Sequence, residues 1–167
     1  PPVDMDWVQR QDSIHEANGG APHFTYLIDV NFDLGNSGRW KTLHNGDKVW
    51  RLAIESGNAQ ALTILYDNFY LPPGATLYVY NEDKSDMIGG FTERNNKSYG
   101  TFANGLVLGE KVILEYFEPK SVEGQGVISI DKVGHAYRFV DMFGRGSDAC
   151  QVDVNCTPEG DNWQDEK

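Results

Sequence analysis

The chain has 167 residues, of which 25 are acidic and 14 are basic, and its formal net charge is −11 at pH 7. This length suits one domain with a real core and leaves little room for two. The excess of acidic residues argues against binding to nucleic acid, which requires a basic protein surface, and against binding to an anionic membrane. No apolar run approaches the roughly 20 residues of a membrane helix. The start is already polar, so a signal peptide, if there was one, has been removed.

The first 22 residues are expected to form an arm, with at most a short helical turn over 8–16. Nine later segments have the alternating, β-branched or aromatic composition of strands, and residues 136–140 can form one more. They are 24–30, 39–43, 49–56, 61–70, 75–80, 87–92, 98–103, 110–117 and 127–133.

The clearest alternation lies in 49–56, where Trp50, Leu52 and Ile54 share one face. Tyr78 and Tyr80 share the outer face of a later strand. Strands recur about every ten residues, with turn chemistry between them and no helix-length pattern. The sequence therefore predicts an all-β fold, an antiparallel β-sandwich of the jelly-roll type.

Four parts are expected along the chain: an arm (1–22), the sandwich (23–140), a cleavable linker (141–149) and the truncated start of a following domain (150–167). The linker contains Arg145-Gly146, a basic residue between glycines, which is typical of a trypsin-like cleavage site or of an ordinary linker. Cys150 and Cys156 do not form a CxxC motif, and they can pair with each other or with partners outside the chain.

No catalytic motif is present. Ser56-Gly57 has no histidine near it in the sequence, and the four histidines (His15, His23, His44 and His135) are scattered without an HExxH pattern. We therefore expect no enzyme activity, no metal site and no cofactor from these residues.

Two ligands remain as alternatives. Asp29, Asn31 and Asp33 resemble a calcium loop, but Leu34 and Trp40 stand where glycine and glutamate are needed. Calcium could instead use the loop carboxylates Glu82, Asp83 and Asp86, although solvated loop carboxylates are the simpler interpretation. A sugar could stack on Tyr78, Tyr80 and Trp40, but cross-strand packing explains the same aromatic residues.

Several segments resemble the N-terminal pro-region of secreted bacterial lysyl-endopeptidase-like, trypsin-like serine proteases. They are Val49-Trp-Arg-Leu-Ala-Ile-Glu-Ser56, Ala61–Phe69, Leu71-Pro-Pro-Gly-Ala-Thr-Leu-Tyr-Val-Tyr80, Gly109–Pro119 and Ile128–Arg138. The stretch Cys150–Cys156, followed by Pro158-Glu-Gly-Asp161, is similar to the opening of the mature protease.

This resemblance implies a secreted bacterial pro-domain whose partner is the cognate protease domain of the same precursor. The catalytic residues would lie beyond Lys167, and Cys150 and Cys156 would bridge to cysteines of that domain. Pro-regions assist protease folding or block the cleft until they are cut. Four residues would then approach the cleft: Tyr137, Arg138, Phe139 and Phe143.

Cleavage is expected between Arg145 and Gly146, whereas a lysine-specific enzyme would prefer Lys132 or Lys167. The competing hypothesis is a carbohydrate-binding or adhesion module of a secreted protein, since this kind of fold serves many functions.

Overall fold

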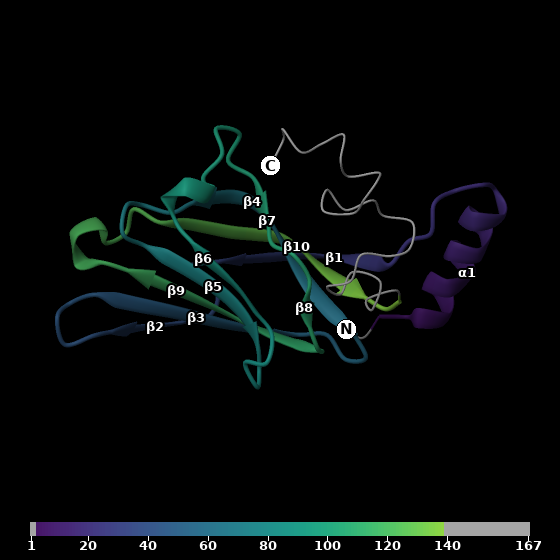
Figure 1. Ribbon diagram of the computed structural model, residues 1–167, viewed down its shortest axis with the longest axis horizontal. Helices are drawn as coiled ribbons and strands as arrows, with labels where there is room; N and C mark the ends of the chain where they lie inside the picture. The colour runs from purple at the N-terminus through teal and green to yellow at the C-terminus, as the bar shows by residue number, and fades with distance from the viewer. Residues whose placement is uncertain (1–2, 139–167) are drawn as a thin grey trace, which may run out of the picture.

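The computed structural model describes residues 3–138, which form two antiparallel sheets packed face to face, with one helix at an end of the sandwich (Figure 1). The first sheet has the order β1 (Thr25–Asp33), β10 (Val127–Ala136), β4 (Ala61–Tyr70), β7 (Phe102–Ala103), and β8 (Val107–Leu108) also pairs with β4. The second sheet has the order β2 (Arg39–Thr42), β3 (Lys48–Glu55), β9 (Lys111–Glu118), β5 (Thr76–Asn81), β6 (Met87–Phe91). This confirms the expected all-β sandwich.

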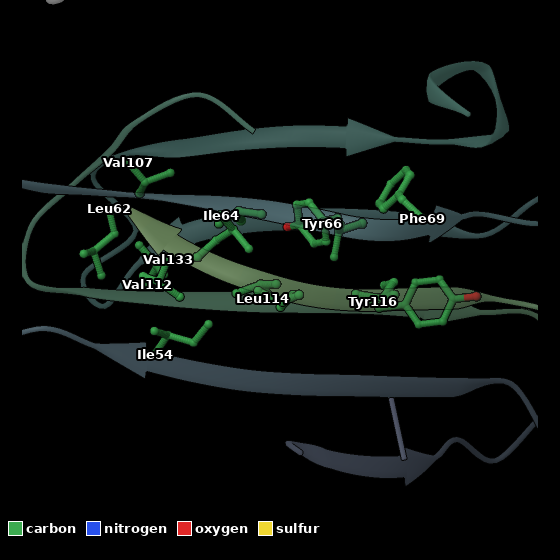
Figure 2. Packing of buried hydrophobic residues seen from close by; sticks show 14 of the residues in the cluster. Ile54, Leu62, Ile64, Tyr66, Phe69, Val107, Val112, Leu114, Tyr116 and Val133 are labelled. Atoms are coloured by element: carbon green, nitrogen blue, oxygen red, sulfur yellow. The ribbon is translucent and has the colours of Figure 1, made fainter. Parts of the chain in front are cut away.

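The core lies between the two sheets and follows the period-2 alternation of the strands. In β9, Val112, Leu114 and Tyr116 are fully buried, and Trp50 of β3 is fully buried beside them. Ile64 of β4 faces them from the other sheet, as Figure 2 shows for the labelled core residues. The alternation read from the sequence therefore assigns the inner faces of the main strands correctly.

The turn between β2 and β3 contains Asn45-Gly46, a dipeptide that is a strong sequence signal for a hairpin. Gly46 has a φ of 88°, a left-handed value that glycine adopts without a steric penalty. The amide of Gly46 donates to the carbonyl of Leu43 over 3.0 Å, and the amide of Leu43 donates to the carbonyl of Asp47 over 2.8 Å. Local turn chemistry was sufficient to predict this element.

In the N-terminal segment, the short helical turn expected over 8–16 is a longer helix of 13 residues, α1 (Met5–Ala17). Asp4 caps it by accepting a hydrogen bond from the amide of Trp7 over 2.9 Å. The ring of Trp7 packs edge-on against Tyr26 of β1, and Val8 is buried. The helix therefore belongs to the folded body.

Three further boundaries differ from expectation. The strand expected over 98–103 is reduced to the two residues of β7, and β8 was not expected. Ala136, expected to begin a separate strand over 136–140, instead ends β10, and Tyr137 and Arg138 are not in a strand; residues 139–140 lie outside the described residues. Two short 3₁₀ helices, η1 (Glu93–Asn95) and η2 (Lys120–Val122), lie in the connections. Among residues 3–138, no helix is both long and apolar enough to cross a membrane.

Candidate functional site

The chain leaves the sandwich at the end of β10, a central strand held between β1 and β4. Immediately after it, the amide of Tyr137 donates to the carbonyl of Phe24 over 3.1 Å. The exit point is therefore fixed beside the start of β1, on the side from which the predicted linker and cleavage site continue.

Helix α1 contacts the segment that follows β10 through a cluster of polar side chains. We call this cluster the exit clasp, and it consists of Asp12, Glu16, His23, Tyr137 and Arg138. The hydroxyl of Tyr137 donates to Asp12 Oδ2 over 2.5 Å. Arg138 Nη2 lies 2.5 Å from Glu16 Oε1 and 3.4 Å from Asp12 Oδ2, and its Nε donates to the carbonyl of His23. The clasp joins residues more than 100 positions apart in the sequence.

Asp12 is the centre of the clasp and is only 5% exposed. Its carboxylate contacts the Tyr137 hydroxyl, the Arg138 guanidinium and His23 Nδ1, the last at 3.2 Å. A buried carboxylate with these partners is satisfied, and removal of a partner is costly because a charge is left without compensation. Burial and the bond to Asp12 raise the pKa of Tyr137 to about 12, so the hydroxyl remains a donor at neutral pH.

Two histidines stack at the edge of the clasp. The rings of His15 and His23 lie 4.3 Å apart, with 18° between their planes. Gly20 packs so closely on His15 that an added Cβ would lie 2.1 Å from its Nε2. The scattered histidines of the sequence are thus partly brought together, but as packing around the clasp.

The structure places only two of the predicted protease-contact residues. Tyr137 and Arg138 are half-buried, and both bind α1. Phe139, Phe143, the cleavage pair Arg145-Gly146, and the cysteines Cys150 and Cys156 lie outside the described residues.

One pair that sequence reasoning missed is Ser56 and His135. Ser56 Oγ lies 2.8 Å from His135 Nδ1, across the gap between the two sheets. His135 is fully buried, its Nε2 has no hydrogen-bond partner within residues 3–138, and burial lowers the pKa of its imidazole. No local pattern reveals the pair, because the two residues are 79 positions apart.

The surroundings of this pair differ from those of a catalytic serine and histidine. Among the residues the structure describes, no carboxylate hydrogen-bonds to the ring of His135. A catalytic histidine needs such a group, or its equivalent, to set its tautomer and to stabilise the imidazolium. The arrangement is that of a neutral histidine in the core, which links the sheets through one hydrogen bond.

The candidate calcium ligands are engaged within the protein. Asp33 Oδ1 accepts from the amides of Gly35 and Asn36, and Asp29 pairs with Lys132. In the second group, Glu82 pairs with Lys111, Asp83 accepts from Ser85, and Asp86 accepts from the amide of Leu108. Within residues 3–138, no group of three or more His, Cys, Asp or Glu side chains is arranged to hold a metal ion.

The aromatic residues considered for sugar stacking do not share a surface. Tyr78 is 39% exposed on the outer face of its sheet, where the hydroxyl of Tyr80 donates to Glu115. Trp40 pairs in register with the buried Trp50 and packs on Tyr116, which belongs to the inner side. The three rings therefore cannot form one flat platform.

A comparison with known proteins adds no family to this description. No family model matches the chain, and no solved structure matches it.

Proposed function

We propose that this chain contains the pro-domain of a secreted bacterial serine endopeptidase, which assists folding of the protease or blocks its cleft until it is cut. One observation supports this most: Tyr137 and Arg138, the last residues that the structure describes, are fastened to α1 by the exit clasp. The clasp gives the sandwich a fixed point from which the proposed cleavable segment continues.

The reach of that segment is limited by covalent geometry. Six residues, 139–144, separate Arg138 from Arg145, and the seven residue-to-residue steps between them span at most roughly 25 Å when extended. The Arg145–Gly146 bond therefore stays close to the clasp and to α1. A protease domain that reads Arg145 would meet this end of the sandwich, where the proposed contact residues Tyr137 and Arg138 lie.

In this proposal the sandwich supplies binding and no chemistry. The peptide bond after Arg145 is hydrolysed by the protease, whose pocket accepts the arginine side chain. Before cleavage, the linker is held in the cleft at a high effective concentration, because it belongs to the same chain. After cleavage that advantage is lost, and the sandwich can dissociate.

Steady-state inhibition measurements test this proposal. The 167-residue chain is incubated with trypsin and with a lysine-specific endopeptidase, and hydrolysis of a small amide substrate is followed while the chain is analysed by mass spectrometry. We expect competitive inhibition of at least one enzyme, relieved as the linker is cut. Arg145→Ala should prolong inhibition of trypsin, whereas Arg94→Ala, at an exposed arginine of the sandwich, should not.

The alternative function has its own readout. The same preparation is tested against a panel of polysaccharides by affinity electrophoresis. Inhibition without retardation by any sugar supports the pro-domain. Tight sugar binding with no effect on either protease would overturn it in favour of a carbohydrate-binding module.

A further inference from the structure

The second sheet is incomplete at one edge. β3 pairs with β9 at all eight of its positions, but β2 pairs only with residues 48–51. Within residues 3–138, the backbone edge of 52–55 on the β2 side therefore has no strand beside it. Arg39, the first residue of β2, lies opposite Arg51, so the pairing of β2 with β3 ends before Leu52 and Ile54.

An apolar cleft opens beside this free edge. β1 is the end strand of the first sheet, so the two sheets do not close on this side. The cleft has a volume of about 490 Å³. Its lining residues come from β1, from the end of β3 and from β10: Ile28, Val30, Phe32, Ile54, Glu55, Ser56, Gly57 and Val133.

The outer side of the neighbouring strand β2 is basic, in a chain whose net charge is −11, whereas Glu55 at the end of β3 is exposed on the same side. Arg39 and Lys41 of β2 are exposed and form no ion pair within residues 3–138. Arg51 lies opposite Arg39 and is paired with Glu115. Basic side chains on an edge disfavour pairing with a second copy of the same edge, and they favour an acidic strand.

A strand that fits this edge has a defined pattern. Alternate side chains point into the apolar cleft, and the others lie beside the basic residues on the outer face. Residues 150–156 of this chain have that pattern: Cys150, Val152, Val154 and Cys156 alternate with Gln151, Asp153 and Asn155. In 139–143, by contrast, Asp141 would share a face with Phe139 and Phe143.

The chain is long enough for this contact. Eleven residues, 139–149, separate Arg138 from Cys150, and they span up to roughly 36–40 Å when extended. The bond between Ser56 and His135 places the Glu55 end of β3 close to the end of β10, from which the chain departs. A strand that starts at this end and follows the free edge runs antiparallel to β3.

We propose that residues 150–156 add as an antiparallel strand to the free edge of β3 at 52–55, with Val152 and Val154 in the apolar cleft and Asp153 beside the basic residues of β2. If the proposed function holds, this contact is the one through which the pro-domain binds the first strand of the protease; this interpretation rests on the proposed function. The contact itself involves only this chain, so the two can be tested separately.

Hydrogen exchange on the full 167-residue chain, read by mass spectrometry under reducing conditions, tests the contact. Three chains are compared: the wild type, the double variant Val152→Asp with Val154→Asp, and a matched control with Gln151→Asp and Asn155→Asp. The first variant puts two charges into the apolar cleft, and the control puts the same two charges on the outer face.

The amides of 52–55 that point away from β9 should exchange slowly in the wild type and in the control. They should exchange about tenfold faster or more in the cleft-facing variant, because the added strand is lost. Exchange at Ile64 in the core should be equal in all three chains, which shows that the sandwich is intact. Equal exchange at 52–55 in all three chains would overturn the proposal, and it would leave the protease inhibition experiment unaffected.

Discussion

Ser56 Oγ and His135 Nδ1, at 2.8 Å, connect the end of β3 in one sheet to β10 in the other. The other ring nitrogen of His135 is buried and has no hydrogen-bond partner in the part of the chain that the structure describes. This single bond is therefore the imidazole's only hydrogen bond among the described residues, and it is formed across the interior of the sandwich.

Ser56→Ala should destabilise the fold by about 1–3 kcal/mol, because it leaves the imidazole of His135 without any partner in the core. Urea unfolding followed by tryptophan fluorescence measures the change. Ser13→Ala is the matched control: Ser13 is exposed on α1 and bonds only to the carbonyl of Gln9. A cost no greater than that of the control would show that the bond contributes nothing to stability.

The same histidine gives the fold a pH dependence. Burial lowers the pKa of His135 in the folded state below its unfolded value, which is about 6.5. The unfolded chain then binds the proton more readily, so the free energy of unfolding is highest above about pH 6.5 and falls as the pH drops toward the folded pKa.

Urea unfolding at several pH values between about 5 and 8 measures this effect. The wild type should lose stability on the acid side of this range. His135→Gln should lose less, since glutamine does not titrate. If the free energy of unfolding changed with pH by the same amount in both proteins, the pH dependence could not be assigned to His135.

Asp12→Asn should loosen the exit clasp. The variant retains the size of the side chain but removes the charge that faces Arg138, and it weakens the bond from the Tyr137 hydroxyl. We expect a loss of about 1–3 kcal/mol and faster trypsin cleavage after Arg10 in α1 and after Arg138. Asp6→Asn, at an exposed position of the same helix, should leave both cleavage rates unchanged.

Gly134→Ala should destabilise the first sheet through crowding. An added Cβ would lie 2.5 Å from Thr63 Cγ2 and 2.7 Å from Thr25 Cγ2, and overpacking of this kind costs about 1–3 kcal/mol. Thr63→Ser removes one of these methyl groups, so the double variant should recover part of the loss. A double variant as unstable as the sum of the single variants would refute the steric explanation.

How far the sequence predicts the fold depends on the range of the interactions. The strands around Trp50 and Leu114 were predictable because alternation along one strand determines which side chains are buried. Helix α1 was underestimated because Val8 is its one buried apolar residue, and its attachment depends on the bond from Asp12 to Tyr137, 125 positions away. Ser56 and His135 escaped notice for the same reason.

The strand predicted over 127–133 stops just before Gly134, whereas β10 includes this glycine and runs to Ala136. In the structure this glycine lies between two threonine side chains that leave no room for a larger residue. A glycine within a strand can mark close packing rather than the end of the element. Only the three-dimensional arrangement of β1, β10 and β4 distinguishes these two cases.

The coding sequence beyond Lys167 tests the central proposal most directly. If the sandwich is the pro-domain of a serine endopeptidase, translation continues into a domain with a catalytic histidine, an aspartate and a Gly-Asp-Ser-Gly segment. A stop codon soon after Lys167, or an unrelated domain without these residues, would contradict the proposal.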